Sequence, residues 1–358
     1  MSRLGIFDFL FSIGTGGLRH LVYVFFVLTL AGCLPSSCRR VDSRAVAPAD
    51  SLSRQLAEQL TPDTLQLVWS ATGSAEAAME YPRTVRFGPA NRLYVSDAQR
   101  NSVFAFAKDG TWLEEITWDS VAVPYLAGLR GDTLVVFNPE NRRLDFVLNG
   151  TAVRSLHTPP EVPRGPLHYA AATDSALYYK VVGDEFEGYL ARLDEHGSIA
   201  ERIPLPGPAW RHAGLLRPWG DSLLSLSGFL PSVDVLTPAG RLDSLALVGF
   251  DSPMLARRYS FLQGDTHESP LLSPAATPAG NWLFVLNLRP GWLRIDVYDR
   301  AGHLQHILTQ ANPGYNKQFY PIDLAVQQDT TGAFDIAVLT VEPVQELRRY
   351  RWQKPESP

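Results

Sequence analysis

Short apolar runs that end in a glycine turn recur along this chain. The clearest is the ten-residue block from Asn101 to Gly110, in which Phe106 holds the sixth position and glycine the last. Glycine supplies the positive φ that a tight hairpin turn needs, so the block predicts a strand that runs into a hairpin. The same pattern, a large apolar residue at position six and a closing glycine, returns in the segments 141–150, 188–197, 231–240 and 293–302.

Each block lies between two further predicted strands, so the repeating unit is a four-stranded meander. The closing glycines recur at intervals of 40, 47, 43 and 62 residues. A period of about 40 to 45 residues with four strands is typical of propeller blades. A blade cannot bury both of its apolar faces alone, so we expect the units to stack around a common axis.

The two ends of the repeat region complement each other. An extra strand at 65–69 precedes the first complete unit, whereas the last unit offers only three predicted strands, at 322–326, 334–339 and 346–352. If the N-terminal strand completes the last blade, the ring has no open edge. The sequence therefore predicts an all-β, six-bladed propeller of four-stranded antiparallel blades over residues 64–353, followed by a tail at 354–358.

The first 32 residues have a different pattern. Arg19 and His20 precede a run of 11 predominantly apolar residues at 21–31, which is too short to cross a hydrocarbon layer of about 30 Å as a helix. Residues 1–32 are therefore expected to be a signal peptide. The segment from Leu30 to Cys33 resembles the lipobox of bacterial lipoproteins, which implies that Cys33 is lipidated and holds the mature protein on a membrane. An uncleaved membrane anchor is the alternative, and either would export the domain.

The residues after Cys33 indicate where the protein goes. No acidic residue follows it directly, and by resemblance to lipoprotein sorting signals this favours the outer membrane. Nothing resembles an acidic surface-export tag, so we expect the periplasmic side. Residues 34–49 are rich in Ser, Ala, Pro and Arg and predict a tether. Asp50 can cap a short helix at 51–60, which either packs on the propeller rim or binds a partner. The segment 33–63 thus comprises the lipidated cysteine, the tether and this helix.

Cysteine content and net charge further restrict how the fold can be stabilised and which partners it can bind. With Cys33 lipidated, only Cys38 remains, so no intrachain disulfide is expected and the fold must depend on its core. The whole chain has a net charge of −5, and removal of residues 1–32 leaves 30 basic and 36 acidic residues. This balance argues against a nucleic-acid partner, because phosphate binding needs a basic face.

The first complete unit carries a family resemblance. Leu93 to Asp97, followed by Asn101, Val103, Phe106 and Asp109-Gly110, resembles the NHL-type repeat of six-bladed propellers. The resemblance covers about residues 64–353 and implies a lipid-anchored propeller of the NHL/TolB-like group, which is common among exported proteins. Asp97 and Asn101 could together hold a cation, but in such repeats these residues usually bond the backbone of a turn.

Catalytic motifs are absent from the sequence. It contains no G-x-S-x-G elbow, no P-loop, no H-E-x-x-H motif and no pair of close cysteines for zinc. The eight histidines are scattered singly, and we expect His157, His212 and His306 to be surface residues rather than metal ligands.

Two features are candidates for a binding site. The insertion at 250–270 is either a specificity loop or a surface decoration. Sites in propellers generally lie where the first strands of the blades begin at the central channel. The residues that we place at this channel mouth are Arg83, Tyr125, His168, Tyr169, Arg211, Glu268 and Asp323. Aromatic rings stack on a ligand and charged groups orient it, so this set suits sugars, peptides or small polar molecules.

Three classes of function follow. The leading prediction is a non-enzymatic envelope protein that binds a protein, peptide or glycan at its channel mouth or rim and needs no cofactor. The second is a metal-dependent hydrolase or lactonase, resembling other six-bladed propellers that hold a divalent cation such as calcium. Its oxygen ligands would come from Glu80, Glu268 and Asp323. The third is a structural subunit of an envelope assembly.

Overall fold

The computed structural model describes residues 43–164, 167–183, 187–264, 267, 270–311 and 316–355. Ser43–Pro358 forms one compact unit. The signal peptide, the lipobox with Cys33, and Glu268 lie outside the described residues. Within the described ranges, no helix is long and apolar enough to cross a membrane.

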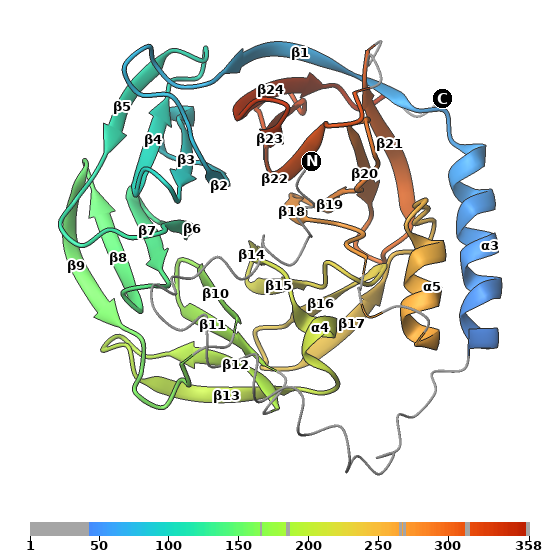
Figure 1. Ribbon diagram of the computed structural model, residues 1–358, viewed down its shortest axis with the longest axis horizontal. Helices are drawn as coiled ribbons and strands as arrows, with labels where there is room; N and C mark the ends of the chain where they lie inside the picture. Colours follow the sequence, from blue (N-terminus) through green and yellow to red (C-terminus); the bar gives the residue numbers. More distant parts are fainter. Residues whose placement is uncertain are drawn as a thin grey trace, which may run out of the picture. The chain divides into compact units, whose positions relative to one another are not determined.

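The strands follow one another as antiparallel meanders that surround a centre (Figure 1). The first meander is β2 (Pro82–Phe87), β3 (Leu93–Asp97), β4 (Ser102–Phe106) and β5 (Trp112–Ile116). The second is β6 (Tyr125–Arg130), β7 (Thr133–Asn138), β8 (Arg143–Leu148) and β9 (Thr151–His157). The third is β10 (Leu167–Ala172), β11 (Leu177–Val182), β12 (Gly188–Leu193) and β13 (Ile199–Leu205).

The remaining strands repeat this arrangement. The fourth meander is β14 (Leu216–Trp219), β15 (Ser222–Leu226), β16 (Ser232–Leu236) and β17 (Leu242–Ala246). The fifth is β18 (Ala275–Ala279), β19 (Trp282–Leu286), β20 (Arg294–Tyr298) and β21 (Leu304–Gln310). The last has three strands from the end of the chain, β22 (Tyr320–Gln328), β23 (Phe334–Glu342) and β24 (Glu346–Trp352). The all-β prediction is thus confirmed over the described residues.

The N-terminal strand β1 (Asp63–Ala71) joins the two ends of the described chain. Its segment Gln66–Ala71 pairs antiparallel with β24, as the sequence predicted. Its first three residues also pair parallel with Leu308–Gln310 of β21, which the sequence did not indicate. A single parallel pair, Ala172 with Gly128, likewise links β10 to β6. Because of these links, the described strands form sheets of eight, eight, four and four strands rather than six separate ones.

The hairpin glycines have the predicted conformation. The closing glycines of the five blocks all have positive φ, for example 90° at Gly110 and 77° at Gly150. At Gly110 a side chain would also collide with β1, because a Cβ would lie 2.6 Å from a ring carbon of Trp69. The Trp69 indole donates a hydrogen bond to the Lys108 carbonyl in the same turn (3.0 Å). Glycine here therefore allows β1 to pack against the first meander.

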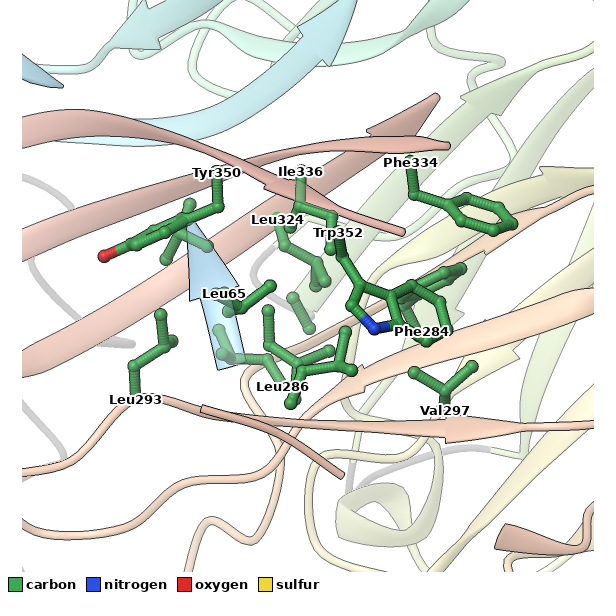
Figure 2. Close-up of a cluster of buried hydrophobic side chains, with 14 of the residues drawn as sticks. Leu65, Phe284, Leu286, Leu293, Val297, Leu324, Phe334, Ile336, Tyr350 and Trp352 are labelled. Atoms are coloured by element: carbon green, nitrogen blue, oxygen red, sulfur yellow. The ribbon is translucent and has the colours of Figure 1, made fainter. Parts of the chain in front are cut away.

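A large apolar core fills the space between the fifth meander and the last strands. Leu65 of β1 is buried in it among the side chains that Figure 2 shows. The labelled members are Leu65, Phe284, Leu286, Leu293, Val297, Leu324, Phe334, Ile336, Tyr350 and Trp352. Residues from opposite ends of the described chain thus share one core.

Among the described residues, three helices and one 3-10 turn accompany the strands: α3 (Ser43–Gln59), α4 (Ala209–His212), α5 (Leu255–Gln263) and η1 (Pro89–Asn91). α3 begins at Ser43, so the helix predicted at 51–60 is longer than expected and takes in part of the predicted tether. It lies beside α5 outside the ring of strands (Figure 1). The Gly249 amide donates to the Ser53 hydroxyl (3.0 Å), which ties α3 to the rim as predicted. α5 lies within the insertion at 250–270.

Candidate functional site

The first strand of each meander lies nearest the centre of the ring (Figure 1). These inner strands are β2, β6, β10, β14, β18 and β22. Three of them, β2, β6 and β22, carry a β-bulge within their first four residues. In β2 the residue between the paired positions Pro82 and Thr84 is Arg83. A bulge re-aims the side chain of its extra residue, so the backbone itself gives Arg83 a special orientation.

Arg83 forms an aromatic and cationic cluster with tyrosines at the beginnings of the inner strands. Its guanidinium carbon lies 3.8 Å from the ring centroid of Tyr81 and 6.0 Å from that of Tyr125. A guanidinium within about 6 Å of an aromatic face is held by the ring quadrupole. We call the set comprising Tyr81, Arg83, Tyr125, Tyr169 and Tyr320 the mouth cluster.

The tyrosines of the mouth cluster influence one another. Burial raises the pKa of Tyr125; the Arg83 charge opposes this rise and Tyr81 adds to it. Burial raises the pKa of Tyr320 to about 12, with contributions from Glu342 and Tyr81. The pKa of Tyr169 is also raised by burial and by Tyr125, against a hydrogen bond with the Gly214 backbone. These hydroxyls therefore stay protonated at neutral pH and donate hydrogen bonds instead of abstracting protons.

A buried carboxylate fixes the start of β2. The Asp97 carboxylate accepts hydrogen bonds from the backbone amides of Glu80 (2.8 Å) and Tyr81 (3.0 Å) and from those of Gln99 and Arg100 (both 3.0 Å). Asn101 accepts one from the Val123 amide (2.8 Å). Asp97 and Asn101 therefore bond turn backbone, which confirms the structural interpretation over the cation site. Asp97 also positions Tyr81 in the mouth cluster.

A buried ionic group, which we call the axial cluster, joins three inner strands. Arg217 of β14 donates to Asp323 Oδ1 (2.7 Å), and Arg86 of β2 to Asp323 Oδ2 (3.4 Å). The Val85 amide donates to the same Oδ2 (2.9 Å). Burial and the neighbouring Arg217 lower the pKa of Arg86 to about 9, and Asp323 opposes this shift. Asp323 is thus held by guanidinium groups inside the ring.

The structure brings only part of the predicted set together. Arg83, Tyr125 and Tyr169 belong to the mouth cluster, and Asp323 belongs to the axial cluster. His168 packs its ring 6.4 Å from that of Tyr179. Burial and the Arg142 charge lower the pKa of His168 to about 4, against a hydrogen bond with the Pro163 backbone. His168 is therefore neutral at pH 7.

Two of the predicted mouth positions precede their strands. β14 begins at Leu216, so Arg211 lies in α4, where its charge acts on Asp234. β18 begins at Ala275, and Glu268 lies in the connection before it, outside the described residues. Of the proposed metal ligands, Glu80 pairs with Arg100 (3.0 Å) and Asp323 with Arg86 and Arg217. In the part of the chain that the structure describes, no three His, Cys, Asp or Glu side chains are grouped to hold a metal ion.

Lys180 is a functional candidate that the sequence reasoning missed. Its ammonium lies 4.8 Å from the Tyr169 ring centroid and donates to the Ser225 hydroxyl (3.0 Å) and the Leu226 carbonyl (3.2 Å). Burial lowers its pKa to about 7, and Asp234 opposes the shift. The available signal was a single cation in the otherwise apolar strand β11. Arg217 gives the same kind of signal in β14.

Two histidines also differ from the prediction. His212 is buried, with Nε2 2.9 Å from the Pro206 carbonyl and Nδ1 3.4 Å from the Asp234 carboxylate. The prediction of a surface residue was wrong for His212, because the short helix α4 folds it back onto β16. His306 is half-buried, and its Nδ1 lies 3.1 Å from Asp63.

Comparison with protein families and with curated proteins finds no match. Solved structures do match. A catalytically inactive virginiamycin B lyase from Staphylococcus aureus, solved with quinupristin, is 9% identical, and the match covers 81% of this chain and all of that one, with a TM-score of 0.51. A streptogramin B lyase is 12% identical, with 80% and 88% covered and a TM-score of 0.49. A luciferin-regenerating enzyme is 11% identical, with 79% and 95% covered and a TM-score of 0.49.

These neighbours are β-propeller proteins, and at such identities the likeness concerns the fold alone. The topology agrees with it, because meanders of antiparallel strands surround a centre and β1 joins the end of the chain to its beginning. The described part of this chain is therefore an all-β protein with the β-propeller fold.

Proposed function

We propose that this chain is a lipid-anchored, six-bladed envelope propeller that binds a polar ligand at the mouth cluster without catalysing a reaction. Six blades follow from taking each meander as one blade and β1 as the fourth strand of the last. The links that β1 and the β6–β10 pair add between meanders account for the sheets of eight strands.

The mouth cluster is the observation that carries the binding proposal. Arg83 stands in a β-bulge over the Tyr81 ring, and the Tyr125 ring of β6 lies 6.0 Å from its guanidinium carbon. Tyr169 of β10 interacts electrostatically with Tyr125, and Tyr320 of β22 with Tyr81. Tyrosine rings offer flat faces to a ligand, and a guanidinium orients it by charge. The raised pKa values of Tyr125, Tyr169 and Tyr320 keep these groups as hydrogen-bond donors, which suits recognition of polar groups.

A protein segment, a peptide or a glycan would offer such groups in the cell envelope. The hydrolase alternative needs Glu80 and Asp323 as oxygen ligands, whereas both carboxylates face arginine side chains. We therefore place the function in ligand binding and take Arg83 as its central residue.

The test is a binding screen of the full chain in detergent against a glycan array and a peptide library. We expect at least one class of probe to bind, and Arg83→Gln to weaken that binding by about tenfold or more, which corresponds to about 1.4 kcal/mol. The matched control is Arg202→Gln, which removes another arginine stacked on a tyrosine, 5.0 Å from the Tyr189 ring. Arg202 lies in the outer strand β13, so this variant should bind like the wild type.

Two outcomes would contradict the proposal. The first is that neither glycans nor peptides bind to the wild type. The second is that the Arg83→Gln variant binds its probe as tightly as the wild type and the Arg202→Gln control do. If the protein chemically converts a bound probe, it is an enzyme.

A further inference from the structure

The axial cluster contains more positive than negative charge. Arg86 and Arg217 share the single carboxylate of Asp323. The three side chains are 10%, 3% and 0% exposed. No other carboxylate of the described residues forms an ion pair with either arginine. One guanidinium charge is thus held in the interior without a counter-charge, although buried ions normally have a paired partner.

The Asp323 carboxylate already accepts hydrogen bonds at both of its oxygens. Its Oδ1 accepts from Arg217, and its Oδ2 accepts from Arg86 and from the Val85 amide. The other hydrogen bonds of the two guanidiniums go to neutral backbone carbonyls, those of Val85, Leu126 and Leu216. Carbonyl dipoles satisfy the N–H groups but do not cancel the charge.

One donor of the axial cluster has no acceptor. Arg217 Nε is buried and finds no hydrogen-bond partner within the described residues. A buried donor without an acceptor costs free energy, and an oxyanion relieves it. A guanidinium presents its N–H groups as a fork that matches the two oxygens of a carboxylate or phosphate.

The axial cluster lies deeper along the same strands that form the mouth cluster. Arg86 follows Arg83 by three residues in β2, and Asp323 follows Tyr320 by three residues in β22. Three residues of strand span about 10 Å. The two clusters are thus successive positions along the same inner strands β2 and β22.

We propose that Arg86 and Arg217 form an oxyanion subsite at the centre of the propeller, which takes a carboxylate or phosphate. The anion supplies the second negative charge and accepts from the guanidinium groups that Asp323 leaves unmatched. The route by which it arrives rests on the proposed binding function of the mouth cluster, whereas the charge imbalance of the axial cluster does not.

Thermal unfolding of the full chain in detergent tests this proposal. The probes are sodium acetate and sodium phosphate, each compared with sodium chloride at equal ionic strength. We expect the wild type to show a saturable rise in Tm of about 2 °C or more with acetate or phosphate beyond that with chloride. A rise in Tm with acetate indicates a subsite for a carboxylate group. A rise with phosphate indicates a subsite for a phosphoryl group.

Substitutions with opposite expected effects identify the residues. Arg217→Gln removes the excess charge, so the response to the anion should vanish. Asp323→Asn leaves two unmatched guanidiniums, so the response should exceed that of the wild type. The matched control Arg241→Gln removes an exposed arginine that pairs with Asp243, and it should respond like the wild type.

The proposal is overturned if the wild type has the same Tm in chloride, acetate and phosphate. This comparison needs no variant. A response that persists in Arg217→Gln would also overturn it. If Arg217→Gln does not fold, Arg217→Lys keeps the charge without the fork, and its response should fall below that of the wild type. Arg83→Gln should keep the response to small anions even if it abolishes ligand binding, so the two proposals can fail separately.

Discussion

Single buried aspartates anchor the third strands of two meanders. Asp145 in β8 accepts hydrogen bonds from the side chains of Asn138 (2.7 Å), Arg143 (2.8 Å) and Ser155 (2.6 Å). Asp296 in β20 accepts from Asn287 (2.7 Å) and Arg294 (2.6 Å) in the same way. In both strands the arginine stands two residues before the aspartate, and an asparagine ends or follows the preceding strand. This repeated group fixes polar donors within sheets that are otherwise apolar.

Removal of such an aspartate should destabilise the fold strongly. Asp145→Ala leaves the buried Asn138 and Arg143 donors without their acceptor, so we expect a loss of about 3 to 5 kcal/mol in the free energy of unfolding. Denaturation in urea, followed by tryptophan fluorescence, measures it. The control is Asp243→Ala, which breaks the exposed pair with Arg241 and should cost at most about 1 kcal/mol. Equal stabilities of the two variants would contradict this role of Asp145.

Lys180 should make stability depend on pH above neutrality. Burial lowers its pKa from 10.5 to about 7, so between these values the unfolded chain binds a proton that the folded chain does not. Stability therefore rises with pH through this window. The raised pKa values of the buried tyrosines act in the opposite direction only near and above pH 10. The pKa of Arg86, lowered to about 9, adds to the rise toward the upper end of the range from pH 7.5 to 9.5, so the Lys180 contribution is read as the difference between the wild type and a Lys180 variant.

Lys180→Met should flatten this rise, and Tm measured from pH 7.5 to 9.5 gives the slope. Lys354→Met is the matched control, since Lys354 stands 4.5 Å from the Trp282 ring near the end of the described chain. It should keep the slope of the wild type. A wild-type slope that survives in Lys180→Met would show that another group titrates in this window.

At the scale of elements, the strand β1 contributes more to the stability of the fold than its exposed surface suggests. Leu65 is 1% exposed and belongs to the core that Figure 2 shows, whereas Leu67, two residues later, is 54% exposed. We expect Leu65→Ala to lower the free energy of unfolding by about 2 to 5 kcal/mol, because the cavity opens between β1, β20 and β24.

Leu67→Ala provides the comparison within the same strand, with the same change of side chain, and should remain within about 0.5 kcal/mol of the wild type. Urea denaturation of both variants measures the difference. Similar values for the two would mean that β1 adds little to the closure of the ring.

Strand positions were predictable because local physics determines them. The closing glycines, such as Gly110 and Gly150, need positive φ, and the apolar runs beside them need a buried sheet face. Helix α3 was harder, because its first turns from Ser43 contain alanine, proline and serine that also suit a tether. The parallel pairing of β1 with β21 depends on where the ring closes, which no local pattern records.

The candidate site was only partly predictable, because part of it is assembled from residues that are far apart in the sequence. Arg83 and Tyr125 lie at strand beginnings, where turn and strand patterns locate them. Arg217 and Asp323 meet although 106 residues separate them, and each looks like an ordinary charged residue in its own segment. Closure of the ring brings such residues together, so the sequence alone does not reveal the axial cluster.

The attachment of the whole molecule to a membrane is the remaining prediction, and Cys33 carries it. The apolar run at 21–31 and the lipobox-like segment ending at Cys33 favour lipidation of that thiol together with removal of residues 1–32. A bacterial host supplied with labelled palmitate should therefore label the wild type and the Cys38→Ser variant in the outer-membrane fraction. Cys33→Ser should lose the label and leave that fraction. A wild type that stays in the membrane without label would favour the uncleaved anchor instead, since the apolar run alone would then hold the protein.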